Sequence, residues 1–456
     1  MTGNPALSLR AAVADLRRRD PGAHHRGPRL PDRDAVAADY AERFAGVPAT
    51  SRAVAEPVVE YPDDVAPVLL GLYGDADRVR GWLPGHPRRV TPASVRDLLA
   101  AAIPPVPARR RARALPVDLG ALPVPRITDR DAGPYLTMGV VHASDDRGSA
   151  LSVHRMLVLG PGRLAVWVVP GRGLGALLDR AGGGPLPVSV NIGVAPAVMV
   201  AAAVNGRFLP AGVSKLDLAG ALAGAPLAVA AGTTQPVPVL ADSEIVLEGV
   251  LGPVTVDETL GAAVAGSMPE VFGYHGRGVR DLPVLVVTGM SARPGARFQA
   301  VVGPGREQSV VLGLGGALSV ALDGAGPGWS AVHDLHFPAS GGGMALLVVA
   351  LAKSGPADDA APALLAPRLF AAHPFVRLVV FTDTDVDITC AEDVWWAVAT
   401  RTNLGADCVT STGWRPVPMV PAEDPLWQAA RPGTGRSYVD ATVPFAVRDL
   451  AARALG

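Results

Sequence analysis

The chain has 456 residues, of which 49% are hydrophobic and 18% charged, and its formal net charge is −1. A chain of this length buries a large core and divides into two or three domains, and its composition is that of a soluble globular protein, not a disordered one. The near-zero net charge gives no electrostatic reason to expect a nucleic-acid partner. Glycine (52 residues) and proline (44 residues) are numerous but spread out, which indicates many turns between short strands.

Cysteine content and the N-terminus place the protein in a cellular compartment. The two cysteines, Cys390 and Cys408, allow neither a disulfide framework nor a thiolate zinc cluster. Arg10 and Arg17–Arg19 have no apolar segment behind them, so we expect no signal peptide. The longest nearly apolar stretch, Ile192–Val204, is shorter than the roughly 20 residues of a membrane span. We therefore expect a cytoplasmic protein without a membrane span.

The first 110 residues predict an N-terminal α/β region. Apolar residues recur with a helical period from Leu7 to Leu16, and Val65–Gly74 is a buried strand or a short helix. Thr91 and the proline after it are typical of a helix start, here for residues 91–103. A Pro- and Arg-rich link at 104–116 places a domain boundary near residue 110. We interpret its arginines as a solvated connector, with a binding patch as the alternative.

Between residues 111 and 300, short apolar runs alternate with Gly-rich turns. This pattern predicts a meander of antiparallel strands, which usually forms one wall of a sandwich or barrel. We expect strands at 136–143, 150–159, 163–170, 187–193, 243–251 and 282–292, and a helix at 194–204. From residue 301 onward, continuous apolar runs at 346–352 and 376–383 predict strands covered on both faces, and 391–401 predicts a helix.

Arg155 lies between apolar residues inside the expected strand 150–159. A buried strand does not hold a lone guanidinium unless a partner or an anionic ligand meets it. The alternative is an arginine on the solvent face of an edge strand, and the strand pattern alone leaves both open.

Other motifs carry less information. The glycine-rich loop Gly171–Gly175 resembles a phosphate-binding loop but is weak evidence alone. His333 and His336 have the spacing of metal ligands, but without a third ligand we interpret them as part of a loop. The acidic segment 383–387 is explained at least as well by turn and cap roles as by catalysis.

Several segments resemble the UbiD family of decarboxylases. They follow the family's order and cover most of the chain: DAGPYLTMGVV (131–141), LSVHRMLVLG (151–160), PLPVSVNIGVAPAVMVAAA (185–203), PAGVSKLDLAGALAG (210–224), SEIVLEG (243–249), HPFVRLVVFTDTDVDI (373–388) and DVWWAVATR (393–401). The resemblance implies an N-terminal α/β segment, a central split β-barrel of flavin-reductase type that binds the cofactor (111–300), and a C-terminal α/β domain (301–456). That last domain makes family members dimers or hexamers, so we expect a homo-oligomer.

The resemblance also implies a chemistry. Family members decarboxylate aromatic or α,β-unsaturated acids, in some cases reversibly, with prenylated FMN that a flavin prenyltransferase supplies. Their arginine lies in N-x-x-x-x-R and their two acids in E-G-P-F-G-E, which match residues 150–155 and 265–270 here. Arg155 is then expected to orient the substrate carboxylate, and Glu270 to protonate the carbon that lost CO2. Ala265 replaces the first acid, which would leave a more positive pocket. The alternative is an Arg155–Glu270 ion pair that only ties two strands together.

The cofactor-binding positions depart from the family pattern. Its metal ligands Asn, His and Glu correspond to Ala150, Arg172 and Lys215, none of which binds a hard cation, so we predict that the usual divalent metal is absent. Arg172 and Lys215 would instead hold the cofactor phosphate directly, with sequence drift as the alternative. Lysine occurs only at positions 215 and 353, which draws attention to the first. Val153, His154 and Gly171 are the other expected cofactor contacts.

A second hypothesis belongs to another functional class. It is a UbiD-like protein without prenylated FMN, either a non-catalytic partner in a complex or a repurposed enzyme that binds another anionic ligand. The missing metal ligands and Ala265 favour it.

Overall fold

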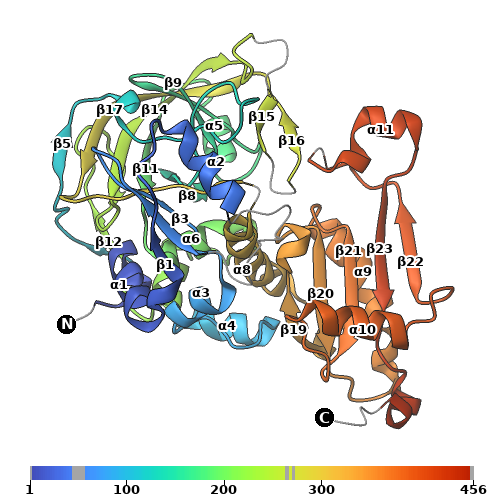
Figure 1. The fold of residues 1–456 in the computed structure, drawn as a ribbon. Coiled ribbons are helices and arrows are strands. Elements are labelled where there is room, and N and C mark those ends of the chain that lie inside the picture. Colours follow the sequence, from blue (N-terminus) through green and yellow to red (C-terminus); the bar gives the residue numbers. More distant parts are fainter. Residues whose placement is uncertain are drawn as a thin grey trace. The chain divides into compact units, whose positions relative to one another are not determined.

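The computed structural model describes residues 3–43, 57–261, 266–269 (as a strand only), 273–303, 305–417 and 419–451. They belong to two compact units (Figure 1). The first comprises Met1–His86 and Ala101–Val311, and the second comprises Pro87–Ala100 and Leu312–Gly456. Within these residues, no helix is both long enough and apolar enough to cross a membrane.

A nine-stranded sheet dominates the described part of the first unit. Its strands are β5 (Arg113–Leu115), β6 (Tyr135–Leu136), β7 (Val140–Asp145), β8 (Gly148–Val153), β9 (Met156–Gly160), β10 (Arg163–Val166), β11 (Leu186–Ile192), β14 (Ile245–Val256) and β17 (Leu282–Ala292). They are ordered β6-β9-β10-β17-β14-β11-β7-β8, with β5 paired to β17, and every pairing is antiparallel. The predicted antiparallel strands are therefore confirmed, but they do not form a simple meander, because β8 and β9 follow one another in the chain and are not paired.

The sheet curls back on itself. Strands β8 and β9 lie near opposite ends of the path, yet only His154 and Arg155 separate them in the chain. Because so short a link spans no more than about 10 Å, the two ends of the sheet lie close together and form a half-barrel. Its interior is apolar, with Met156, Val190 and Leu247 fully buried. The single strand expected at 150–159 is wrong: the apolar pattern continues through the break, but the chain changes direction at Arg155.

Three helices pack beside strand β8. They are α5 (Leu174–Arg180), α6 (Pro196–Ala203) and α7 (Lys215–Ala223), and each contacts this strand. Helix α6, expected from its alanine-rich sequence, is buried over nearly its whole length. Helix α7 begins with a capping box between Ser214 and Asp217 and ends at Gly224, whose positive φ of 64° suits a left-handed cap. These caps fix the position at which Lys215 enters the fold.

The N-terminal segment adds a small sheet and helices to the first unit. Strands β1 (His24–Arg26), β2 (Val58–Tyr61), β3 (Val68–Leu70) and β18 (Phe298–Gln299) form the sheet, and the helices are α1 (Leu9–Arg19), α2 (Asp34–Arg43) and α3 (Ala76–Trp82). Of the two alternatives for Val65–Gly74, the buried strand is confirmed by β3. Further short strands are β4 (Val106–Pro107), β12 (Ala228–Ala230), β13 (Val239–Leu240), β15 (Gly266–Pro269) and β16 (His275–Arg277).

The second unit is an α/β domain with a five-stranded sheet in its described part. Its strands are β19 (Val332–His336), β20 (Leu346–Leu351), β21 (Leu378–Asp383), β22 (Cys408–Thr412) and β23 (Gly435–Asp440), and its helices include α4 (Pro92–Ala100), α9 (Ala361–Ala372), α10 (Ala391–Arg401) and α11 (Pro425–Ala430). Strands β20, β21 and β23 run parallel. The continuous apolar runs at 346–352 and 376–383 predicted the first two of these strands. Helix α8 (Arg306–Asp323) begins in the first unit and ends in the second.

Candidate functional site

Arg155 lies where the half-barrel closes, and it is buried against a carboxylate. Its Nε donates to Oε1 of Glu258 at 2.8 Å and its Nη2 donates to Oε2 at 2.9 Å. The side chain of Arg155 is 10% exposed and that of Glu258 is not exposed at all. This two-point contact is the strongest geometry of an ion pair in proteins. The alternative of an arginine on the solvent face of an edge strand is therefore wrong.

Both oxygens of Glu258 accept a second hydrogen bond. The hydroxyl of Tyr135 donates to Oε1 at 3.1 Å, and the main-chain N–H of Val279 donates to Oε2 at 2.9 Å. Burial and the negative charge of Glu258 both raise the pKa of Tyr135, so its hydroxyl stays protonated and remains a donor. Each oxygen of Glu258 thus accepts two hydrogen bonds, which fixes the orientation of the carboxylate.

Trp167 and His154 complete the surroundings of Arg155. The guanidinium carbon lies 5.1 Å from the centroid of the Trp167 ring, a cation–π contact. His154 contacts the main-chain oxygen of Trp167 through Nδ1 at 2.8 Å and the hydroxyl of Ser152 through Nε2 at 2.7 Å. Since a carbonyl only accepts, Nδ1 carries the proton. Burial lowers the pKa of His154 to about 4, so the ring is neutral near pH 7.

Lys215 is a buried amine that contacts main-chain carbonyl oxygens. Its Nζ donates to the main-chain oxygens of Leu151 in β8 and Ala202 in α6, at 2.9 and 2.8 Å. The Ala202 carbonyl belongs to the last turn of α6, where helix carbonyls lack partners within the helix and attract a cation. Burial lowers the pKa of Lys215 to about 7. The amine thus ties β8 to α6, and it has one more hydrogen to donate when it is charged.

Arg172 lies just before α5, half-buried, close to another cation. Burial lowers the pKa of Arg172 most, and the positive charge of Arg207 lowers it further. Ala150 is buried in β8 and lies near Gly173, Val153 ends the same strand, and Gly171 has a φ of +68° with open space where a Cβ would be. The sequence-predicted cofactor positions thus cluster around β8 and the loop before α5.

This set of side chains suits an anion better than a metal ion. An alkyl group and two cations offer no lone pairs to a divalent cation, whereas neighbouring cations suit a phosphate. Across the residues that the structure describes, no group of three His, Cys, Asp or Glu side chains is arranged to hold a metal ion. That includes the acidic segment 383–387 and also His333 and His336, for which the expected loop is wrong, because both lie in strand β19.

The expected proton donor and the altered acid position cannot be located. Glu270 and Ala265 lie outside the described residues. Sequence reasoning missed Glu258 and Tyr135, which are separated from their partners by 103 and 123 residues. Glu258 follows Asp257 in the short polar stretch after β14, and two adjacent acids there give no signal of this role. The expectation of an arginine left more positive by Ala265 has to be revised, because Glu258 neutralises it.

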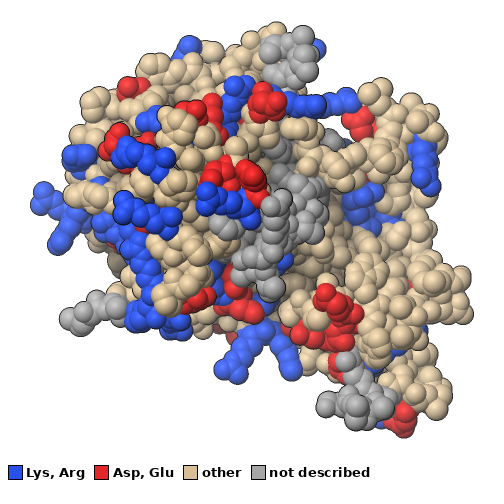
Figure 2. All heavy atoms as spheres, viewed as in Figure 1, with Lys and Arg blue, Asp and Glu red and all other residues tan. Residues whose placement is uncertain are grey.

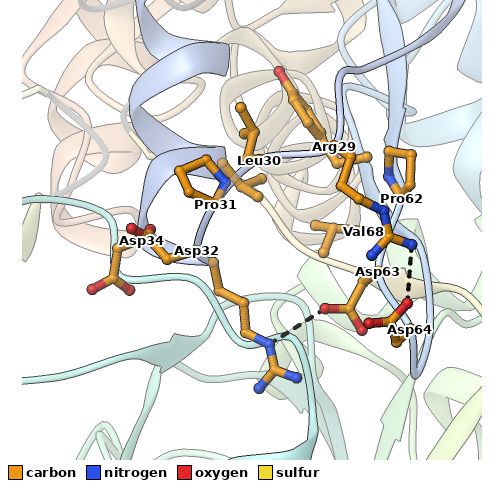
Figure 3. A pocket seen from close by; sticks show the side chains of 12 residues that line it. Arg29, Leu30, Pro31, Asp32, Asp34, Pro62, Asp63, Asp64 and Val68 are labelled. Carbon is orange, nitrogen blue, oxygen red and sulfur yellow. Dashed lines mark hydrogen bonds and ion pairs between the residues drawn. The ribbon is translucent and has the colours of Figure 1, made fainter.

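A polar pocket of about 470 Å³ lies in the N-terminal segment, between the start of α2 and the turn from β2 to β3 (Figure 3). Arg29 pairs with Asp64 at 2.9 Å and Arg33 with Asp63 at 3.3 Å, while Asp32 and Asp34 accept hydrogen bonds from main-chain N–H groups. None of the site residues lines it. Over the surface seen in Figure 2, basic and acidic side chains are likewise interspersed. Both arginines of this pocket are engaged by aspartates, so it offers no unpaired cation to an acidic ligand.

The first unit is a half-barrel with a buried arginine at its closure, and the second is an α/β domain. Comparison with family models assigns this architecture to the carboxy-lyases. Residues 103–307 match the model of the 3-octaprenyl-4-hydroxybenzoate carboxy-lyase Rift-related domain, and residues 320–441 match the C-terminal domain of the same enzyme. Together the two matches cover well over half of the chain. The chain belongs to the UbiD family of carboxy-lyases.

Individual relatives agree with this assignment. Gallate decarboxylase of Lactiplantibacillus plantarum is 31% identical over 342 residues, which are 72% of this chain and 69% of the relative. The apo structure of a 3,4-dihydroxybenzoic acid decarboxylase from Enterobacter cloacae superposes with a TM-score of 0.88 at 27% identity, covering 99% of this chain and 97% of the other. An evolved dimeric form of the UbiD-class enzyme HmfF from Pelotomaculum thermopropionicum, in complex with prFMN, has a TM-score of 0.76 at 25% identity, covering 96% and 95%.

Proposed function

We propose that the chain is a non-oxidative, reversible decarboxylase of an aromatic or α,β-unsaturated carboxylic acid that uses prenylated FMN. The observation that supports it most is the buried Arg155, held rigid where the half-barrel closes. Hydroxylated benzoic acids are the first substrates to test, because gallate and 3,4-dihydroxybenzoic acid decarboxylases are among its relatives.

The proposed roles follow from the chemistry of the side chains. Prenylated FMN, when bound, supplies the electron sink that a decarboxylating acid needs. Arg155 binds the substrate carboxylate and orients it, since a rigid guanidinium recognises a carboxylate at two points. Glu270, assigned by the family pattern alone, delivers the proton to the carbon that loses CO2.

The cofactor phosphate is proposed to lie near Arg172 and Lys215. The support is electrostatic: Arg172 lies near a second cation, Arg207, and the amine of Lys215 donates to two carbonyl oxygens. A phosphate dianion would offset these like charges, and the basic side chains would neutralise it as the divalent metal does in the family pattern. Val153, His154 and Gly171 border this region and are proposed as further contacts. The enzyme would then work without the usual metal.

The cellular setting forms part of the same proposal. The enzyme would be cytoplasmic, receive its cofactor from a flavin prenyltransferase and assemble as a homodimer or larger oligomer. Residues 1–110 would form an N-terminal α/β region, 111–300 the cofactor-binding domain and 301–456 the oligomerisation domain.

A second candidate is a UbiD-like protein that binds a different anionic ligand and no prenylated FMN. The altered metal positions, Ala150, Arg172 and Lys215, favour it because the family's metal cannot bind to them.

One experiment separates these two functions. The protein, co-expressed with a flavin prenyltransferase and purified without oxygen, is incubated with gallate, 3,4-dihydroxybenzoate and pyrrole-2-carboxylate. Loss of acid and incorporation of labelled CO2 into the remaining acid are followed by chromatography. Turnover of one acid that Arg155→Gln abolishes supports the decarboxylase. Flavin-loaded, folded protein that neither turns over nor exchanges label with any aromatic or unsaturated acid would contradict it.

A further inference from the structure

We infer that Glu258, braced by Tyr135, is the positioning residue that sets the orientation of Arg155 for the substrate. This inference rests on the proposed function and assigns a role to two residues that lie outside the family's acid pattern. Position 265 of that pattern holds alanine, and Glu258 comes seven residues earlier in the sequence.

The burial of the pair is the first argument. An ion pair taken out of water has to recover a large desolvation cost, and it does so only with good geometry and with further hydrogen bonds to every remaining lone pair. Glu258 meets both conditions, with two donors from Arg155, one from Tyr135 and one from Val279. A carboxylate whose two oxygens each accept two hydrogen bonds is held in one orientation, so it is suited to hold Arg155 in place.

The direction of the guanidinium is the second argument. Glu258 contacts the Nε and Nη2 edge, so Nη1 and its two N–H groups point away from Glu258. Trp167 covers one face of the same plane. One edge and one face of the guanidinium are therefore fixed, and the plane in which it meets an acceptor is set by the protein before a ligand arrives.

The register of the sheet is the third argument. Tyr135 is fully buried and pairs with Leu157, two residues after Arg155, in the ladder between β6 and β9. The sheet itself therefore brings the phenol to the carboxylate, and removing the hydroxyl would leave Glu258 free to tilt. Such a small displacement lowers the rate without removing the charge.

A purely structural ion pair is the competing explanation, since the same contact ties the end of β14 to the break between β8 and β9. The two explanations differ in what a conservative substitution changes. A structural pair lowers stability, and activity falls only in proportion to the folded fraction. A positioning pair lowers activity in protein that is folded and loaded with cofactor.

The test compares Glu258→Gln, Glu258→Asp and Tyr135→Phe in the cofactor-loaded protein. The matched control is Glu248→Gln, because Glu248 is also a buried carboxylate, lies on β14, and accepts from the main-chain N–H groups of Thr234 and Gln235 instead of a guanidinium. For each variant kcat, KM, the melting temperature and the bound flavin are measured.

We expect Glu258→Gln to lower kcat/KM about 100-fold, in part through a lower kcat. Its cofactor content and folding should match those of Glu248→Gln. Tyr135→Phe is expected to lower it about 10-fold, and Glu258→Asp to recover part of the loss. Unchanged kcat/KM in folded Glu258→Gln, or a loss no larger than that of Glu248→Gln, would overturn the inference. If Glu258→Gln does not fold, Tyr135→Phe decides by the same criterion.

A binding measurement separates this inference from the proposed function. Affinity for unreactive benzoate is determined by calorimetry on wild-type, Glu258→Gln and Glu248→Gln protein. Absence of turnover by wild type contradicts the decarboxylase alone. If Glu258→Gln lowers the affinity for benzoate about 10-fold and Glu248→Gln leaves it unchanged, the orientation of Arg155 by Glu258 is still supported. Equal affinities of the three proteins overturn it.

Discussion

Two basic side chains, Arg155 and Lys215, are buried beside strand β8 of the half-barrel, and their hydrogen-bond partners differ in charge. Arg155, just after β8, has a carboxylate on two of its nitrogens. Lys215 contacts the Leu151 carbonyl of β8 and the Ala202 carbonyl of α6, and burial lowers its pKa to about 7. A buried charge is stable when an opposite charge meets it. Arg155 has such a partner within the protein, whereas for Lys215 we propose that the cofactor phosphate supplies it.

The largest expected effect comes from breaking the complete pair. Arg155→Met should lower the free energy of unfolding by about 3–5 kcal/mol, because it leaves the carboxylate of Glu258 buried without its cation. The measurement is urea unfolding of the cofactor-free protein. The double variant Arg155→Met/Glu258→Gln should be more stable than the single variant, since the uncompensated charge is gone. A double variant less stable than Arg155→Met would contradict the account of a compensated pair.

The next largest effect concerns His154, the neutral histidine that directly precedes Arg155 in the sequence. The pKa of His154 is about 4 in the folded protein and near 6.5 in the unfolded chain. The unfolded chain therefore binds more protons between these values, so stability is full above pH 6.5 and falls as the pH drops toward 4. The loss amounts to about 3 kcal/mol.

Urea unfolding at a series of pH values checks this prediction. His154→Gln should flatten the decline between pH 6.5 and 4, while substitution of the exposed His275 to glutamine should leave the curve unchanged. A decline of equal slope in His154→Gln would show that the ring is not held neutral.

A smaller effect tests Lys215, whose amine donates to two main-chain carbonyl oxygens. Lys215→Met should weaken FMN binding about 10-fold, because a charged donor near the phosphate is lost. Fluorescence quenching of FMN measures the dissociation constant. The chain supplies a matched control in its only other lysine: Lys353 is engaged by Asp359 and Thr442 in the second unit, so Lys353→Met should leave FMN affinity unchanged. Equal affinities of wild type and Lys215→Met would remove Lys215 from the phosphate site.

The smallest effect is expected in the polar pocket of the N-terminal segment, where both partners of a pair are exposed. Arg29→Gln breaks its contact with Asp64, and exposed ion pairs contribute little to stability. Urea unfolding and the decarboxylation assay should both give wild-type values. A clear loss of activity would show that this pocket serves the reaction after all.

The sequence predicted the long strands of the two main sheets better than the centre of the site. Period-2 runs and continuous apolar runs located β11, β17, β20 and β21, because burial of one or both faces leaves a direct trace in residue type. The break at Arg155 leaves no such trace, since apolar residues continue on both sides of it. Glu258 was invisible because the pair joins residues 103 positions apart, and only the closure of the half-barrel brings them together. The family pattern located Arg155 but directed attention to position 265.

The most direct test of the central claim is the cofactor content of the protein. After co-expression with a flavin prenyltransferase and purification without oxygen, the absorption spectrum, the native mass and the manganese content are measured on one sample. The account predicts one prenylated FMN per chain and no stoichiometric metal. A folded protein that takes up no flavin would contradict the decarboxylase, and stoichiometric manganese with the flavin would contradict the direct contact of Arg172 and Lys215 with the phosphate.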